Sequence, residues 1–441
     1  MTGRRTHIRI PVAGRYITPL GDEFASVEAL SGIVLLLAAV VALAWANSPW
    51  SDSYTSFWGY DVTATLGRFS IADDLGHWVN DGLMAIFFFV VGLEVKRELT
   101  EGELTDRRAA SLPLLAAVGG MVVPALVFFA WNPSGPGSSG WGIPMATDTA
   151  FALGVLALLG ARVPPGLKLF LLTLAVVDDI GAICVIAVFY SSGVRVEWLA
   201  GAALTIAVLV LMQRLGVRYA LAYLAPALVL WVCVFQSGVH ATIAGVLLAF
   251  AIPTRTRINA TEFSVKARGL LDHFDRTETG DLLVLTSKGQ QEAIIGLERA
   301  SEGVTAPLLR LEHALHGFSA FVVMPLFAFS NAGVGLNGSF GGGVTLAVIL
   351  GLAVGKPLRI TGASLTAVRL QLASLPDGVS WTALHGCAWL GGIGFTMSLF
   401  IAALAFDGTT LLDSAKVGIL SGSVVSGVIG AVILRRATRA A

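Results

Sequence analysis

Two adjacent carboxylates, Asp178 and Asp179, lie inside an apolar stretch, residues 168–190, that is long enough to cross a bilayer. An acid near the middle of a membrane helix costs roughly 2.5 to 3.5 kcal/mol on insertion scales, so ionisable residues there indicate ion or proton handling. At a separation of about 5.5 Å and an effective dielectric of about 20, two ionised carboxylates repel by roughly 3 kcal/mol. The pair is therefore expected to retain one proton, which a cation can replace.

The chemistry of this pair favours a hard cation. Carboxylate oxygens suit Na⁺ better than they suit soft metals, so Na⁺ at Asp178 and Asp179 in exchange for H⁺ is the simplest prediction. Because successive helical residues point about 100° apart, the two acids are expected to have separate partners. Lys356, a base inside a later apolar run, is one candidate partner. A structural ion pair with Lys356 is the alternative interpretation for either acid.

A third acid, Asp148, lies in the segment 142–151, which a proline and two threonines interrupt. The glycine-rich segment 390–398 is a second interruption, and broken helices in corresponding positions of two halves are typical of transporter sites. Helix ends inside a membrane carry partial charges, and we expect Asp148 to offset a positive end and Lys356 a negative one. A plain helix-capping role for Thr147 or Asp148 is the competing interpretation.

Composition places the chain in the membrane. With 55% apolar residues, 13% charged residues and a mean hydropathy of +0.77, it is far more apolar than a soluble domain. The formal net charge is zero, and no basic stripe supports a nucleic-acid partner. The three cysteines are widely spaced in apolar runs, which favours neither a disulfide framework nor a metal site. No nucleotide-binding motif is present, and no cofactor is expected.

The apolar runs predict an all-α integral membrane protein with about twelve transmembrane helices. They cover residues 27–47, 78–96, 112–131, 144–160, 168–190, 196–213, 219–236, 238–253, 314–334, 343–367, 383–406 and 414–434. Lys and Arg concentrate on alternate connections, which predicts that both termini are cytoplasmic. The domain organisation that follows is a cytoplasmic tail (1–26), a transmembrane domain (27–434) and a second cytoplasmic tail (435–441).

Two connections are longer than a link between helices requires. The external loop 48–77 contains the segment 60–71, whose β-branched and aromatic residues predict a short hairpin, with an irregular loop as the alternative. The segment 254–310 is polar and mixed in charge, and it predicts a long cytoplasmic loop insertion to which we assign no chemistry.

A series of motifs runs in one order from about residue 30 to residue 434, apart from much of 254–310. These motifs are residues 80–85, 91–99, 146–160, 178–179, 237–242, 311–316, 327–334, 355–357 and 394–398. Together they closely resemble the NhaA-type sodium/proton antiporters. The resemblance implies an NhaA-like fold with inverted repeats, for which these transporters are themselves the standard example, and with two discontinuous, crossing helices.

The resemblance also implies residue roles. Asp178 and Asp179 would carry the exchanged ions, with Asp178 alternately protonated or paired with Lys356, and Thr147 and Asp148 would support the crossing of the broken helices. The residues that it implies for adjustment of activity with pH are Glu94, Arg97, Glu98, His240, Glu312, His313 and His316. On the residues alone, 94–98 is read as a solvated helix end and His240 as a core histidine.

The predicted function is a secondary antiporter of a bacterial cytoplasmic (inner) membrane that exports Na⁺ or Li⁺ against external H⁺. By resemblance, exchange would be electrogenic and pH-regulated, and the hairpin at 60–71 would support a homodimer. One rival is a cation-coupled symporter of the same architecture. The other is an intramembrane aspartyl protease, which requires two acids that face each other from separate spans.

Overall fold

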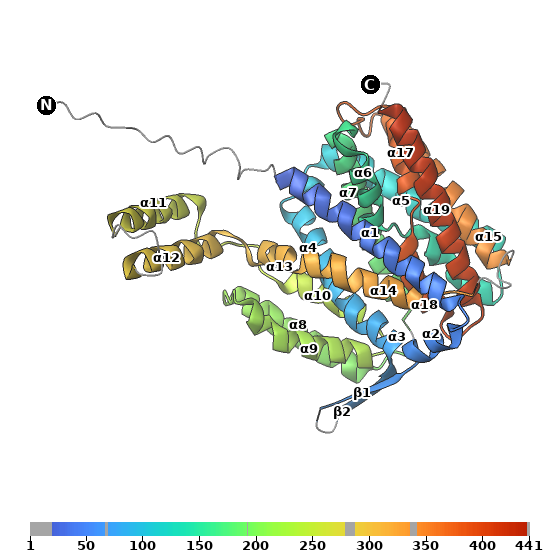
Figure 1. The fold of residues 1–441 in the computed structure, drawn as a ribbon, viewed down its shortest axis with the longest axis horizontal. Helices are drawn as coiled ribbons and strands as arrows, with labels where there is room; N and C mark the ends of the chain where they lie inside the picture. Colours follow the sequence, from blue (N-terminus) through green and yellow to red (C-terminus); the bar gives the residue numbers. More distant parts are fainter. Residues whose placement is uncertain (1–19, 67–68, 192, 278–286, 336–341, 439–441) are drawn as a thin grey trace.

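The structure, a computed structural model, describes residues 20–66, 69–191, 193–277, 287–335 and 342–438 (Figure 1). These residues form a helical bundle from which a β-hairpin and a helical hairpin project, as Figure 1 shows. The bundle matches the predicted fold class.

The helices follow one another along the whole described chain. The α-helices are α1 (Leu20–Ala46), α2 (Ser51–Trp58), α3 (Leu75–Trp78), α4 (Met84–Thr100), α5 (Arg107–Trp131), α6 (Thr149–Leu158), α7 (Pro165–Phe189), α8 (Val196–Arg214), α9 (Ala220–Gln236), α10 (Thr242–Ala251), α11 (Ala260–Arg276), α12 (Lys288–Val304), α13 (Pro307–Phe318), α14 (Met324–Asn331), α15 (Gly343–Leu350), α16 (Lys356–Arg369), α17 (Trp381–Leu390), α18 (Phe395–Phe406) and α19 (Leu411–Ala437). The 3-10 segments are η2 (Glu103–Thr105), η3 (Pro136–Met145) and η4 (Gly160–Arg162), and the π segments are η1 (Val79–Leu83), η6 (Ser319–Val323) and η7 (Gly351–Gly355).

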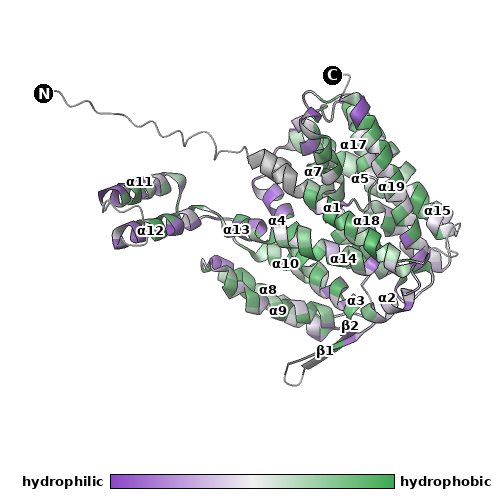
Figure 2. Cartoon of the chain, viewed as in Figure 1, coloured by the Kyte–Doolittle hydropathy of each residue, from purple (hydrophilic) through white to green (hydrophobic). Residues whose placement is uncertain are grey.

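Within the described residues, eight helices are long and apolar enough to cross a membrane, and two further spans are bent pairs, η3 with α6 and α17 with α18. The shorter apolar helices α9 and α10 account for the remaining predicted runs. Apolar residues dominate these helices, as the hydropathy colouring of Figure 2 shows. Each of the twelve predicted runs therefore coincides with a helix or a bent pair, and the count of twelve crossings stays a prediction.

Three of the long spans contain a π turn. The segments η1, η6 and η7 join α3 to α4, α13 to α14 and α15 to α16 without ending the helix. A π turn inserts one residue into a helix and is common at functional sites. The turn η7 directly precedes Lys356, so it sets the direction in which that side chain leaves the helix.

Small residues allow the helices to approach closely. A Cβ added to Gly92 of α4 would lie 2.7 Å from the Cβ of Ala249 and 3.2 Å from the Cα of Val246, both in α10. No side chain fits there, and membrane helices commonly pack through such contacts. The helices α4 and α10 are thereby held backbone to backbone.

The connection after α1 contains the predicted hairpin. Strand β1 (Asp61–Leu66) pairs antiparallel with β2 (Phe69–Asp74), and the register runs from Asp61 opposite Asp74 to Leu66 opposite Phe69. The two residues of the turn, 67 and 68, lie outside the described residues. The hairpin projects from the bundle beside α3, at the lower edge of Figure 1.

The segment 254–310 differs from the prediction of a loop insertion. It contains α11 and α12, which pack against each other as a hairpin that stands apart from the bundle (Figure 1). A capping box starts α11: Asn259 accepts from the backbone N–H of Glu262, whose side chain accepts from the backbone N–H of Asn259. Two helices that pack only against each other carry polar outer faces, so the segment as a whole is polar. This polar composition resembled that of a loop.

The ends of the chain also differ from the predicted bounds. Helix α1 begins at Leu20, inside the predicted tail 1–26, because the helix continues through polar residues before its apolar run. Helix α19 continues to Ala437, inside the predicted tail 435–441. Residues 1–19 and 439–441 lie outside the described residues.

Candidate ion-binding site

Two helix breaks lie next to each other at the centre of the bundle. One separates η3 from α6 at residues 146–148, with a bend of 40°, and the other separates α17 from α18 at residues 391–394, with a bend of 42°. The backbone N–H of Asp148 donates to the carbonyl of Ile393 (2.7 Å), and the Ser398 hydroxyl donates to the carbonyl of Ile143 (2.7 Å). The breaks predicted around 142–151 and 390–398 are thus joined to each other.

Asp148 faces the positive ends of two helices. Its Oδ1 accepts from the backbone N–H of Phe151 (2.9 Å), which caps α6. Its Oδ2 accepts from the backbone N–H (3.0 Å) and the hydroxyl (2.5 Å) of Thr396, in the first turn of α18. Both helix N-termini therefore meet one buried carboxylate, which is the charge compensation expected from the sequence. The capping interpretation also holds, since the same contacts cap α6.

Lys356 lies at the opposite, negative end of a break. Its Nζ donates to the carbonyl of Met145 (2.5 Å), the last residue of η3, and to the hydroxyl of Thr147 (2.6 Å). The same Nζ lies 2.9 Å from Oδ2 of Asp178, and both side chains are completely buried. A buried pair of this kind is stable only when each charge has further polar partners, which the carbonyl and the hydroxyl supply here.

Thr147 connects the first break to both of its neighbours. Its hydroxyl lies 2.6 Å from Oδ2 of Asp178 and 3.0 Å from the carbonyl of Gly391, in the second break. A hydroxyl has one proton to donate, so it binds one of these two oxygens at a time. Thr147 can therefore change its partner when the charge on Asp178 changes.

Asp178 and Asp179 have separate surroundings, as their helical spacing predicts. Asp178 faces Lys356 and Thr147, while its Oδ1 is buried with no hydrogen-bond partner among the described residues. Asp179 instead lines a cavity of about 680 Å³. One acid is held by the helix breaks and the other is open to the cavity.

The first cavity, as we name this space, runs from Asp179 to a group of charged residues. Its polar lining consists of Ser31, Glu94, Arg97, Asp148, Thr149, Lys168, Asp179, Glu312, His316 and Ser319. The rest of the lining is mostly apolar, from α4, α6, α7 and the span of α13 and α14. The same space therefore contacts Asp179 and the charged residues.

Five of the seven residues predicted to adjust activity with pH lie together, and all of them except Glu98 line this cavity. We call them the acid–base cluster: Glu94, Arg97, Glu98, Glu312 and His316. Arg97 forms ion pairs with Glu312 and, at 3.1 Å, with Glu98, while Nδ1 of His316 lies 3.8 Å from Oε1 of Glu94. The cluster joins α4 to α13, and Glu98 and Glu312 are buried, so this part of α4 is not a solvated helix end.

The structure separates two predicted residues from this cluster. His313 is exposed on α13. His240 lies between α9 and α10, where its Nε2–H donates to the carbonyl of Tyr190 (2.6 Å). Burial lowers the pKa of His240, so the imidazole is neutral at physiological pH. This position matches the core-histidine interpretation.

Two threonines of the site were missed from the sequence. Thr396 binds Asp148, and Thr149 lines the first cavity. Threonine is common in membrane helices because its hydroxyl can donate to the carbonyl four residues earlier, as Thr173 does to Leu169 (2.9 Å). The available signal was position: Thr149 lies within the predicted interruption 142–151 and Thr396 within the predicted interruption 390–398.

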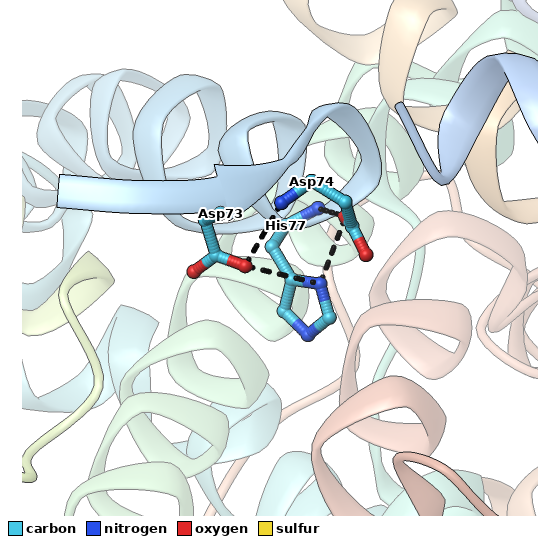
Figure 3. Close-up of side chains that lie close together, drawn as sticks. All are labelled: Asp73, Asp74 and His77. Atoms are coloured by element: carbon cyan, nitrogen blue, oxygen red, sulfur yellow. Dashed lines mark hydrogen bonds and ion pairs between the residues drawn. The ribbon is translucent and has the colours of Figure 1, made fainter. Parts of the chain in front are cut away.

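A further polar group, Asp73, Asp74 and His77, lies at the base of the β-hairpin (Figure 3). It is the one group of His, Cys, Asp and Glu side chains with metal-site spacing in the described part of the chain. Nδ1 of His77 lies 2.9 Å from Asp74 and 3.6 Å from Asp73, and Nε2 lies 3.7 Å from Asp407. A protonated imidazole accounts for all three contacts as partly exposed ion pairs, which contribute little stability.

A second cavity, of about 690 Å³, lies at the hairpin end of the bundle. Its polar lining includes Asp74, His77, Asn80, Asn331, Asp407 and Lys416. The amide of Asn331 donates to the side-chain oxygen of Asn80 (2.8 Å) at this lining. The bundle thus has a cavity toward each end, and Asp179 lines the first.

Comparisons with known proteins agree with this geometry. The family model described as "Na+/H+ antiporter 1" matches residues 22–434. A relative named Na(+)/H(+) antiporter NhaA from Koribacter versatilis is 46% identical over 94% of this chain and 90% of its own length. Relatives of the same name from Oleidesulfovibrio alaskensis (47% identical, 94% of this chain and 93% of the relative) and Helicobacter pylori strain 26695 (46%, 93% and 94%) are similarly close.

Proposed function

Since the chain belongs to the Na⁺/H⁺ antiporter family and is a transporter rather than an enzyme, we propose that it exchanges Na⁺ for H⁺ at Asp178 and Asp179. This function agrees with the main prediction from the sequence and not with the symporter or protease alternatives. The protease would also need two facing acids from separate spans, whereas these acids are neighbours on α7.

The observation that carries the proposal is the state of three carboxylates, those of Asp148, Asp178 and Asp179. Both oxygens of Asp148 are occupied by helix N–H and hydroxyl donors. Oδ1 of Asp178 has no partner among the described residues, and Asp179 opens to the first cavity. A structural ion pair with Lys356 explains one oxygen of Asp178 and leaves the other oxygens available for a hard cation.

Competition at these oxygens couples the two ions. A Na⁺ ion that arrives through the first cavity requires ionised carboxylates, so the protons bound there must leave first. When Na⁺ binds Asp178, it competes with the ammonium of Lys356, which keeps the carbonyl of Met145 and the hydroxyl of Thr147 as partners. Protons from the opposite side then bind the carboxylates and displace Na⁺, and the pair with Lys356 forms again when Asp178 releases its proton to the first cavity's side.

We assign the first cavity to the cytoplasmic side, which follows from the positions of Lys and Arg in the sequence. The protein then exports Na⁺, and also Li⁺, from a bacterial cytoplasmic membrane in exchange for external H⁺, with both termini cytoplasmic. If Asp178 and Asp179 both cycle between proton and cation, more than one H⁺ enters per Na⁺, and exchange is electrogenic.

The acid–base cluster adjusts this activity with pH in our proposal. Its five side chains link α4 to α13 at the entrance to the first cavity, so a change in their protonation changes ion pairs between two helices. Entry of Na⁺ to Asp179 then depends on the charge of the entrance.

The β-hairpin is the proposed dimer contact. Its strands project from the bundle, and Asp61, Val62 and Thr63 of β1 are exposed. An exposed two-stranded edge can pair with the same edge of a second copy.

Collapse of a pH gradient in everted vesicles tests the exchange function. Addition of Na⁺ or Li⁺ should dissipate the gradient in the wild type, while Asp179→Asn and Asp178→Asn should abolish the response. Asp272→Asn, an exposed position on α11, is the matched control and should behave as the wild type. Retained exchange in Asp179→Asn would exclude this site. Repetition with and without an imposed membrane potential tests whether exchange is electrogenic.

A further inference from the structure

Two helices converge on the deep end of the first cavity. Each presents one face to it, and the lining residues are Thr149, Ala150, Leu153, Leu156 and Ala157 from α6, and Pro165, Gly166, Lys168, Leu169, Leu172, Val176 and Asp179 from α7. The break at residues 146–148 precedes α6, so Thr149 is the lining residue of that helix next to the break. Asp179 lines the cavity from α7.

Thr149 supplies the one polar side chain on the α6 face of the cavity. Its Oγ1 is buried and has no hydrogen-bond partner in the described part of the protein. A buried hydroxyl without a partner is unfavourable, so a position of this kind needs an explanation in an ordered water, a ligand or an ion. Oδ1 of Asp178 is a second buried oxygen in the same condition.

We propose that Oγ1 of Thr149 is a ligand of the transported alkali cation, a neutral oxygen that completes the coordination begun by Asp178 and Asp179. The inference rests on the proposed exchange function and extends it to cation preference. A hydroxyl oxygen is a hard donor, and Na⁺ and Li⁺ take several oxygen ligands. The positive end of α6, which would otherwise repel a cation, is already offset by Asp148.

A neutral ligand and a titrating acid have different effects on exchange. The hydroxyl does not change its protonation in the working pH range, so it contributes to cation binding and not to proton binding. Loss of the hydroxyl therefore raises the half-saturating Na⁺ concentration and leaves the maximal rate at saturating Na⁺ close to that of the wild type. Loss of either aspartate removes exchange altogether.

Purified protein in proteoliposomes provides the test, with Thr149→Val as the variant that keeps the shape and removes the hydroxyl. We expect the half-saturating Na⁺ concentration to rise about tenfold, the size of one contact to a charged partner. Thr149→Ser, which keeps the oxygen, should stay within about threefold of the wild type. The matched control is Thr205→Val, a buried threonine of α8 whose hydroxyl donates to the carbonyl of Gly201 (2.8 Å) and which does not line the cavity.

The outcomes separate this inference from the proposed function. If the half-saturating Na⁺ concentration is unchanged in Thr149→Val, or rises as much in Thr149→Ser as in Thr149→Val, Thr149 is not a ligand. Either result leaves the proposed exchange function standing, because Asp179→Asn tests that function separately. If Thr149→Val does not fold, as size-exclusion chromatography reports, Thr149→Cys takes its place, because sulfur is a poor ligand for a hard cation. A half-saturating concentration that changes by different factors for Li⁺ and Na⁺ in Thr149→Val supports a direct ligand. A maximal rate that falls equally with both ions contradicts a direct ligand.

Discussion

At the scale of single residues, the site depends on buried charges that satisfy one another. Lys356 serves as counter-charge to Asp178 and as donor to the end of a broken helix. Loss of one partner of a buried ion pair leaves an uncompensated charge, which is far more costly than replacement of both. The Lys356–Asp178 pair is therefore a matter of stability as well as of ion exchange.

This reasoning predicts that Lys356→Met destabilises the folded protein by about 3 to 5 kcal/mol, because Asp178 is left buried without its ammonium partner. The double variant Asp178→Asn/Lys356→Met should recover a large part of that loss. Thermal unfolding of the detergent-solubilised protein, followed by tryptophan fluorescence, measures both effects. Additive losses in the double variant would show that the two side chains do not stabilise each other.

The pH dependence of stability has a separate origin at His240. Burial lowers the pKa of His240 in the folded protein. In the unfolded chain the imidazole has a pKa of about 6.5, so it binds a proton more strongly there. The contribution of His240 is therefore fully present above that pH and is lost as the pH falls below it. We expect the fall in melting temperature between about pH 7 and pH 5 to be smaller in His240→Gln, with an unchanged pH midpoint of exchange. A shifted midpoint would instead make His240 a pH sensor.

At the scale of elements, α17 is held against α16 by a histidine whose tautomer is fixed. Nε1–H of Trp389 donates to Nε2 of His385 (3.1 Å), so the imidazole proton is on Nδ1 and is donated to the hydroxyl of Thr361 (2.9 Å). That hydroxyl donates in turn to the carbonyl of Pro357 (2.8 Å), the residue after Lys356. The chain of bonds fixes the helix of Lys356 relative to the helix that ends at the second break.

Trp389→Phe should therefore lower the free energy of unfolding by about 0.5 to 1.5 kcal/mol, the usual value of one hydrogen bond. Trp381→Phe, at an exposed position of the same helix, is the control and should have little effect. Chemical or thermal unfolding compares the two variants. An equal effect of both would mean that the indole N–H has no role in fixing α17.

The helical hairpin of α11 and α12 can be deleted to test whether the bundle folds and transports without it. Its ends are adjacent, since the backbone N–H groups of Arg257 and Ile258 donate to the carbonyl of Gly303 (2.8 and 3.1 Å). Replacement of residues 259–302 by Gly-Gly should keep the bundle folded and Na⁺/H⁺ exchange intact. The control is the full-length chain with Gly-Gly inserted after Ile258. Loss of exchange in the deletion alone would assign the hairpin a part in transport.

These elements also show what the sequence can and cannot predict. The apolar runs and the buried charges Asp148, Asp178, Asp179 and Lys356 are visible because charge inside an apolar run is rare. The pairing of the two breaks was not visible in detail, because hydrogen bonds such as that between Asp148 and Ile393 join residues far apart in the chain. The helices α11 and α12 were missed because polar composition was weighed above the capping signals that begin them.

At the scale of the whole molecule, the two cavities of the bundle differ in the side chains that line them. Asp179 lines the first cavity, whereas the lining of the second includes the bonded amides of Asn80 and Asn331 and neither Asp178 nor Asp179. In our proposal, alternating access requires that Asp179 lose its contact with the first cavity during transport and gain contact with the second. The direction in which the first cavity opens, toward the cytoplasm or away from it, depends on the orientation of the chain in the membrane.

Single cysteines in a background without Cys184, Cys233 and Cys387 can determine that direction. Ala157→Cys lines the first cavity and Thr55→Cys lines the second. A charged thiol reagent that does not cross membranes should label Thr55→Cys in intact cells and Ala157→Cys in everted vesicles, because the distribution of Lys and Arg places the first cavity on the cytoplasmic side. Labelling of Ala157→Cys in intact cells would contradict this topology and would place the first cavity, with Asp179, on the external side.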